Sequence, residues 1–556
     1  MKWKKLEHNG ILFPPDFETK KIKIKIKGES VDLDINQEEM IYQWAKKKDT
    51  PYALDKVFQK NFLADFAKTF GKKYKKLELD DVDFKNAFNL VDKEKDAKEL
   101  LTKEEKKALA AKRKELREEM KVKFGTGKMD GNEVEIANYM AEPPGIFIGR
   151  GEHPLRGKWK PKVTSKDVTL NLGKEAKVPA GNWGKIVHDQ ESMWMASWTD
   201  FLTQKRKYVW LADTAGIKQD RDKAKYDKAK MLAKEIETIK NKIVKDMQSK
   251  DPKVRRISTV CWLIYRTAMR VGDEKDPDEA DTVGATTLRK EHVTLTSDAI
   301  KFDFLGKDSV RWQETVPAVG NDKQFHENLK ELTAKIKATD EIFGNLTSRD
   351  VNEYYKTVVK GLTAKVFRTF SASTVVSKYL NENGDVKKGS QMEKLYHAKL
   401  ANLEAAIMCN HKRTIPKTFE QSLQKKRDTL KTAEKATPWK KNEEVLKKAE
   451  STKTKTDAQE KKRKERITKI KGMIKKSKAK QKERVEKLRL QLDLTEKTRD
   501  YNLGTSLRNY IDPRIFKSWT DEVTADWEKL YTAALQKKFL WVKSENESWQ
   551  NVSKHY

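Results

Sequence analysis

Cysteine is almost absent from this sequence. Cys261 and Cys409 are the only two among 556 residues, which argues against a disulfide scaffold and against a cysteine-rich zinc site. Long apolar runs are missing as well, since none approaches the roughly 20 residues that a membrane-spanning helix needs. The first residues, MKWKKLEHNG, lack the apolar stretch of a secretory signal. We therefore expect an intracellular protein of a reducing compartment, without membrane contact.

Two common catalytic motifs are also absent. The chain contains neither a GxxxxGK(S/T) phosphate loop nor HExxH. The first absence argues against a nucleotide hydrolase and the second against a zinc hydrolase.

Positive charge is what the sequence has in excess. Lys and Arg number 119 against 85 Asp and Glu, a formal net charge of +34. A field of this size favours polyanions, and binding that releases condensed counterions weakens steeply with salt. Charge alone favours a nucleic-acid partner and leaves DNA or RNA open. The alternative is a basic protein that is merely soluble or associated with ribosomes.

The chain is too long for one compact domain, and its pattern changes along its length. The first 210 or so residues mix short strands and helices: Lys20 to Asp34 alternates like a hairpin with Gly28 at its turn, and Thr102 to Lys123 reads as a polar helix in solvent. From about Asp213 the pattern becomes strongly helical, and two apolar stripes follow.

Three features of this helical region bear on function. The second stripe, which starts at Ile257, predicts a helix that ends at Gly272 with Arg270 in its last turn. Alternation through Ile300, Phe302 and Phe304, and again from Val310 to Trp312, predicts a hairpin with Lys307 at its tip. A later helix is expected to end in Cys409-Asn410-His411.

A strongly basic segment runs from Lys417 to Arg499, with about 29 basic and 13 acidic residues. A broken apolar stripe predicts an antiparallel pair of long helices that turns between Glu450 and Asp457. The alternative is a disordered basic tether. The last 60 or so residues return to a globular composition.

Cleavage of a phosphodiester without metal or ATP sets three requirements: a nucleophile, cations that stabilise the charge around phosphorus, and an acid for the leaving oxygen. Arg suits the second task because its planar fork donates to two oxygens, and Lys suits the third because it holds a transferable proton. Tyr makes the step reversible because phenolate is itself a good leaving group. Composition alone assigns no residue to these roles.

Local strings do assign them. Five strings resemble the eukaryotic-type DNA topoisomerase IB family of the tyrosine recombinase/topoisomerase superfamily, in the family's order and approximate spacing, and the segments Glu142–Gly145 and Gly149–Gly151 add to the likeness. The five are Ala280–Gly284 (ADTVG), Phe304–Ser309 (FLGKDS), Gly361–Thr369 (GLTAKVFRT), Met408–His411 (MCNH) and Gly504–Arg514 (GTSLRNYIDPR).

The resemblance implies an active site. Tyr510 matches the nucleophile, Arg270 and Arg368 match the two arginines of the transition state, and His411 matches the histidine that donates to a non-bridging oxygen. Lys307 matches the lysine that protonates the leaving 5′ hydroxyl. Taken singly, each residue has an ordinary explanation. Arg270 could interact with a helix dipole and Lys307 could be a solvated turn residue. His411 could cap a helix, and Tyr510 could be an amphipathic surface residue.

Three further matches, Arg150, Asp308 and Asn509, are DNA-binding positions that flank the cleavage site and, in the family, contact inhibitors of the camptothecin type. Ile148 departs from the family, which usually has arginine there. From the resemblance we expect the chain to lack the long charged N-terminal region of nuclear members and the acidic C-terminal finish of the family. A nuclear location, or another site of cellular or viral DNA, is therefore expected from the resemblance alone.

The resemblance implies an α+β, mostly α fold: a bilobed DNA clamp with a mixed α/β cap lobe, a helical catalytic lobe, a coiled-coil-like linker and a small helical C-terminal domain. It implies an ATP-independent enzyme that relaxes positive and negative supercoils through a 3′-phosphotyrosyl intermediate, with double-stranded DNA as partner, as a monomer, and with no cofactor or metal. The rivals are a tyrosine recombinase and an architectural DNA- or RNA-binding protein. The expected domains are cap and hinge 1–213, catalytic core 214–413, linker 414–495 and C-terminal domain 496–556.

Overall fold

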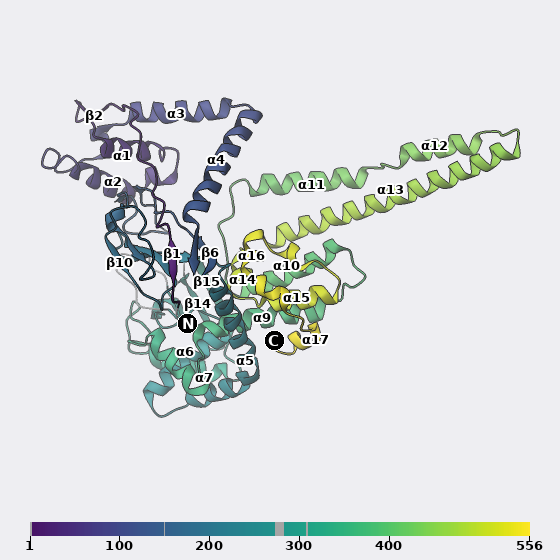
Figure 1. Cartoon of the computed structure of the whole chain (residues 1–556). Helices are drawn as coiled ribbons and strands as arrows, with labels where there is room; N and C mark the ends of the chain where they lie inside the picture. Colours follow the sequence, from purple (N-terminus) through teal and green to yellow (C-terminus); the bar gives the residue numbers. More distant parts are fainter. Residues whose placement is uncertain (1–2, 150, 273–282, 307–309) are drawn as a thin grey trace. The chain divides into compact units, whose positions relative to one another are not determined.

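The computed structural model describes residues 3–149, 151–272, 283–306 and 310–556. They fold into two compact units, one holding the described residues up to Asp222 and the other those from Lys223 onward. The chain is α+β and mostly helical, as the sequence predicted (Figure 1). In these ranges no helix combines the length and the apolar character that crossing a membrane requires.

The first unit contains a small sheet in the order β3-β2-β4. Ile24 and Ile26 are buried while Lys25 between them is exposed, so the strand covers a core with one face. Gly28 turns the hairpin with φ 85°, which confirms the predicted hairpin. The elements are β2 (Ile24–Ile26), β3 (Glu29–Val31), β4 (Val82–Asp83), α1 (Ile35–Ala45), α2 (Lys56–Lys68) and α3 (Lys85–Leu100).

Helix α4 (Lys103–Phe124) is the predicted polar helix, and none of its residues is buried. Thr102 and Glu105 cap its first turn reciprocally, which satisfies backbone donors that a helix start leaves free. The helix keeps its shape through capping and charge rather than through a core face.

A larger sheet completes the first unit, in the order β1-β5-β6-β12-β11-β9-β10. Its pairs are antiparallel except β9 with β10, and Trp198, Val209 and Leu211 lie in the core beneath it. The strands are β1 (Leu6–His8), β5 (Thr126–Met129), β6 (Asn132–Ala137), β9 (Thr169–Asn171), β10 (Lys185–Val187), β11 (Trp194–Thr199) and β12 (Arg206–Leu211), with a separate pair β7 (Gly145–Ile146) and β8 (Trp159–Lys160).

The two helical stripes and the predicted hairpin contribute to the first core of the second unit. Leu232, Ile239 and Ile243 are fully buried together with Val260 and Phe302. The elements are α5 (Gly216–Asp246), which starts before the unit boundary, α6 (Pro252–Thr267), β13 (Val293–Leu295), β14 (Ala299–Gly306), β15 (Val310–Pro317), α7 (Asp322–Thr333) and α8 (Ser348–Val358).

The predicted end of α6 was wrong. The helix ends at Thr267 rather than at Gly272, because Ala268 adopts a left-handed conformation with φ 51°. The segment that follows pairs with another stretch of backbone instead: the amides of Ala285 and Thr286 donate to the carbonyls of Arg270 and Val271 at 2.8 and 2.7 Å. Arg270 thus stands beyond the helix, on an extended segment.

A second core in this unit joins helices on both sides of the basic segment. Ala372, Ala401, Ile515, Phe516 and Trp519 are all buried in it. The apolar residues after Tyr510 therefore fold onto the helices that precede the basic segment. Its helices are α9 (Ala364–Asn383), α10 (Gln391–Met408), α14 (Leu503–Asn509), α15 (Pro513–Glu522), α16 (Ala533–Lys538) and α17 (Trp549–Ser553).

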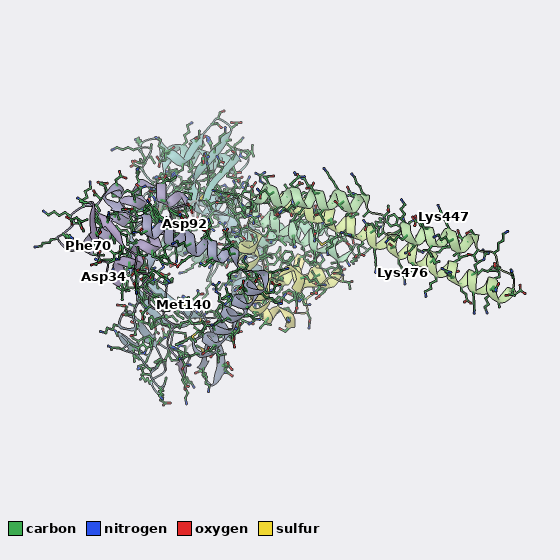
Figure 2. All side chains as sticks on the ribbon, turned by 90° about the horizontal axis from the view of Figure 1, so that it is seen from above. Asp34, Phe70, Asp92, Met140, Lys447 and Lys476 are labelled. Atoms are coloured by element: carbon green, nitrogen blue, oxygen red, sulfur yellow. The ribbon has the colours of Figure 1, made fainter. Side chains whose placement is uncertain are left out.

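The basic segment forms the predicted helical hairpin (Figure 1). Helices α11 (Phe419–Lys435) and α12 (Lys440–Ser451) run back along α13 (Asp457–Lys497), and the turn falls at residues 452–456 as expected. The first arm breaks around Pro438, which cannot continue a helix. Ala449, Ile470 and Ile474 form a thin apolar seam. Figure 2 shows lysines on both arms of the hairpin, among them Lys447 and Lys476.

Candidate active site

Arg270 is held by the backbone around it. Gly272, with φ 84°, passes so close to Gly284 that a Cβ on Gly284 would lie 2.4 Å from the Gly272 Cα. With the two backbone hydrogen bonds at 270–271, this close approach fixes the direction in which the arginine leaves the chain. Burial and the charge of Arg368 lower the pKa of Arg270, while the Tyr510 hydroxyl, within hydrogen-bonding reach, opposes that shift.

Arg368 enters from the second turn of α9 and is only 6 % exposed. Its Nη1 donates to the carbonyl of Ala268 at 2.8 Å, and its Nη2 donates to the carbonyl of Cys409. These two carbonyls belong to the ends of α6 and α10, so a single guanidinium joins the segments that carry Arg270 and His411. Its Nε is buried and has no hydrogen-bond partner among the described residues.

His411 follows the end of α10, where the sequence placed it. Asn410 takes a left-handed φ of 50°, and the His411 amide donates back to the Ala406 carbonyl at 2.8 Å, so the chain turns sharply off the helix. The His411 carbonyl accepts from the Asn502 amide at 2.8 Å, which ties this turn to the start of α14. Burial, with help from Arg368 and Arg270, lowers the pKa of His411 to about 3, so the imidazole is neutral at physiological pH.

Tyr510 caps α14 and packs between these groups. Its ring stacks on the His411 ring with centroids 5.4 Å apart, and the Arg368 Cζ lies 5.1 Å from its centroid. Its amide donates to the Ser506 carbonyl at 2.9 Å, and its carbonyl accepts from the Ser373 hydroxyl at 3.4 Å. Arg270, Arg368, His411 and Tyr510 are thus brought together within one unit.

An ionic network that sequence reasoning did not identify lies directly after Tyr510. Asp512 is fully buried and binds Arg514 through both of its carboxylate oxygens. Arg514 also binds Asp227 at 2.7 Å, and the Tyr556 hydroxyl donates to Asp512 at 2.8 Å. The signal was in the sequence, since Asp512 and Arg514 are part of the string around Tyr510, but their buried pairing requires the fold.

Lys307, Asp308 and Arg150 lie outside the described residues, so their predicted roles stay predictions. The strands before and after 307–309 pair as expected, with Gly306 opposite Val310. The Asn410 side chain donates to the Arg311 carbonyl at 3.0 Å, which links this hairpin to the turn before His411.

Asn509, the third predicted DNA-binding position, is exposed next to Tyr510. Its side chain donates to the Thr505 carbonyl at 3.2 Å, and Lys225 donates to its backbone carbonyl at 3.2 Å. The exposed amide is therefore available to a ligand that reaches Tyr510.

The arrangement has the chemical character of an anion-binding site with a nucleophile. Two guanidiniums surround a phenol, and a neutral imidazole offers a further hydrogen bond, since Nε2 of His411 is buried and has no partner among the described residues. Positive charge held close to a phenol favours attack on a substrate that gains negative charge, such as a phosphoryl group. Across the described ranges no group of three or more His, Cys, Asp or Glu side chains could hold a metal ion.

Models of known families match most of the chain. Residues 1–211 match the DNA-binding fragment of eukaryotic DNA topoisomerase I, residues 214–445 match its catalytic core, and residues 482–551 match the C-terminal topoisomerase domain. The stretch from 446 to 481, which these matches leave out, lies in the helical hairpin.

Individual proteins similar to this chain carry the same family name as the matching models. DNA topoisomerase 1 alpha of Arabidopsis thaliana is 37 % identical over 97 % of this chain and 58 % of its own length. Human DNA topoisomerase 1 is 33 % identical over 97 % of this chain and 71 % of its own length, and the Candidozyma auris protein of that name is 33 % identical over 99 % and 83 %. The chain thus spans less than two thirds of the Arabidopsis relative. The chain belongs to the eukaryotic DNA topoisomerase I family.

Proposed function

We propose that this chain is a type IB DNA topoisomerase, which relaxes positive and negative supercoils through transient cleavage of one strand, without ATP or an obligatory metal. The observation that carries the proposal is the meeting of four side chains in one unit: the Tyr510 ring lies 5.4 Å from that of His411 and 5.1 Å from the Arg368 Cζ, with Arg270 within reach of its hydroxyl. Family membership supports the same reaction.

In the proposed cleavage step the Tyr510 oxygen attacks the phosphorus. A bond forms between phosphorus and the tyrosyl oxygen, the bond to the 5′ oxygen breaks, and the 3′ phosphate stays on the protein. Arg270 and Arg368 stabilise the added negative charge, and the Nε2 proton of His411 binds a non-bridging oxygen. Lys307 is assigned the proton for the departing 5′ oxygen. The phenolic proton passes to solvent water as the bond forms, and religation reverses each transfer.

Between cleavage and religation the DNA rotates inside the clamp. In this proposal residues 1–213 and 214–413 enclose duplex DNA as a monomeric bilobed clamp, chiefly through phosphates and hence with little sequence preference. Residues 414–495 are the basic linker that slows rotation electrostatically, and residues 496–556 deliver Tyr510. Arg150, Asp308 and Asn509 are assigned to the DNA around the cleavage site. The expected site of action is the DNA of the nucleus.

Relaxation of a supercoiled plasmid in EDTA without ATP tests the proposal, with wild type beside Tyr510→Phe. The expected result is relaxation of both positive and negative supercoils by wild type only, because the phenylalanine variant lacks the attacking oxygen. An architectural binder would relax neither substrate with either protein. A tyrosine recombinase would require defined sites and would join two partner duplexes. Failure of wild type to relax the plasmid would reject the proposed function.

A further inference from the structure

A serine of the tyrosine-bearing helix contacts the active-site imidazole. The Ser506 Oγ lies 2.7 Å from Nδ1 of His411, and both side chains are buried, the serine fully and the histidine to 6 % exposure. Ser506 stands four residues before Tyr510, one helical turn away on α14. The contact therefore joins the helix of the nucleophile to the turn that carries His411.

The neutral state of His411 makes the position of its single proton decisive. Burial beside two arginines keeps the imidazole uncharged at physiological pH. A neutral imidazole has one nitrogen that donates and one that accepts. The proton lies either on Nδ1, which faces Ser506, or on Nε2, which faces away from it.

The Ser506 hydroxyl favours one of these two states. Within the described ranges, Nδ1 of His411 is the one hydrogen-bond partner of the Ser506 hydroxyl. Were Nδ1 protonated, the serine would have to accept, and its own proton would be left in a buried place without an acceptor, which is unfavourable. When the serine donates to Nδ1, that proton is satisfied and the imidazole proton moves to Nε2.

Nε2 of His411 is the imidazole atom available to bind a ligand. It is buried and unpartnered among the described residues, and so is Nε of the neighbouring Arg368. A buried donor without a partner is uncommon in a folded protein and calls for an explanation such as an absent ligand. An oxygen of a bound phosphate would accept from such a donor.

We propose that Ser506 is a positioning residue that donates to Nδ1 of His411 and so keeps the imidazole proton on Nε2, directed at the phosphate oxygen. Only the identity of that ligand rests on the proposed function. The backbone carbonyl of Ser506 also accepts hydrogen bonds from the amides of Tyr510 at 2.9 Å and Ile511 at 3.1 Å. Ser506 thus orients the imidazole with its side chain and the nucleophile with its backbone.

Imidazole ¹⁵N NMR of the full chain without DNA tests the proton's position directly. The chain carries eight histidines, so the His411 signals are assigned by their loss in His411→Gln. The expected wild-type spectrum shows a protonated Nε2 and an unprotonated Nδ1, and Ser506→Thr, which keeps a hydroxyl, shows the same. Ser506→Ala should show a mixture or the opposite tautomer. A wild-type Nδ1 proton, or a spectrum unchanged by the alanine, would overturn the proposal.

A second experiment measures the rate of single-turnover cleavage on a duplex substrate that traps the cleaved strand. Ser506→Ala should cleave about tenfold more slowly than wild type, which corresponds to the loss of one ordinary buried hydrogen bond, and Ser506→Thr should recover most of the rate. Ser377→Ala, which removes another fully buried hydroxyl, should match wild type. An equal loss in both alanine variants would assign the effect to packing and contradict the proposal. Should wild type cleave nothing, the proposed function fails while the NMR result still decides the tautomer.

Discussion

The guanidinium of Arg368 lies with its Cζ 5.1 Å from the centre of the Tyr510 ring while it binds the carbonyls of Ala268 and Cys409. One side chain therefore stabilises the ends of two helices and holds positive charge beside the nucleophile. Structural and chemical roles coincide in this arginine, and a substitution should affect both.

Arg368→Lys should lower the relaxation activity although it keeps the positive charge. Lysine keeps the positive charge, but a single ammonium cannot reach both carbonyls in the geometry of a planar fork. We expect relaxation to fall by about 10² or more, the usual effect of removing one preorganised donor. Plasmid relaxation checks this, with Lys378→Arg on the exposed face of α9 as a control that should remain active. Activity of Arg368→Lys close to wild type would contradict a role that depends on the planar fork.

His411 should make stability depend on pH in a defined direction. Its pKa is lowered to about 3 in the folded chain, whereas an unfolded histidine titrates near 6.5. As the pH falls below about 6.5 the unfolded chain takes up a proton that the folded chain does not, so the stability contributed by this residue is complete at higher pH and declines toward pH 3. His411→Gln lacks this term.

Urea unfolding of both proteins measures the effect. Between about pH 6.5 and 5.5 wild type should lose about 1 kcal/mol relative to His411→Gln. A difference that does not change with pH, or a relative gain by wild type on acidification, would show that the folded imidazole takes up its proton normally.

Gly284→Ala should disturb the active site from outside it. The new Cβ would meet the Gly272 Cα at 2.4 Å and the Arg270 carbonyl oxygen at 3.0 Å, so the segment that carries Arg270 has to shift. We expect a destabilisation of about 1–3 kcal/mol, as for other overpacked sites, together with a lower cleavage rate. Gly472→Ala is the matched control: a Cβ there meets nothing within 4 Å, and it lies inside α13, where alanine should stabilise by about 0.5–1 kcal/mol. Equal stability of the two variants would contradict the crowding argument.

Asp512→Asn should weaken the attachment of the segment after Tyr510. The substitution leaves Arg514, which is 5 % exposed, without its buried counter-charge and with Asp227 as its remaining carboxylate partner. Loss of one partner from a buried pair typically costs about 3–5 kcal/mol. Urea unfolding checks this, and Asp521→Asn, which replaces an exposed aspartate paired with Lys517 on the same helix α15, should change stability by less than about 1 kcal/mol. A cost below about 1 kcal/mol for Asp512→Asn would show that the pair does not hold this segment.

Periodicity predicted much of the fold because it records which faces are buried. The hairpin at Gly28, the polar helix α4, the paired strands β14 and β15 and the helical hairpin with its turn all follow from alternation or from apolar stripes. The end of α6 did not follow, since the apolar stripe continues through Val271 while Ala268 leaves the helix. The bonds that favour this break come from Arg368, Ala285 and Thr286, which lie well beyond any local window.

The candidate site shows the same division. The family resemblance indicated Arg270, Arg368, His411 and Tyr510, and the fold brings them together. Ser373, Ser506 and the pairing of Asp512 with Arg514 could not be predicted from the sequence because each acts through a buried hydrogen bond that only tertiary packing creates. A serine or an aspartate looks the same in sequence whether it is solvated or holds a neighbour in place.

Detergent trapping of the covalent intermediate tests the central claim most directly. DNA labelled at either end is mixed with protein, quenched with sodium dodecyl sulfate and digested with protease, for wild type and Tyr510→Phe. The account predicts a wild-type adduct in which a peptide containing Tyr510 is joined to a 3′ phosphate and the opposing end is a free 5′ hydroxyl, with no adduct in the variant. Attachment to a 5′ phosphate, or an adduct that persists in Tyr510→Phe, would contradict it.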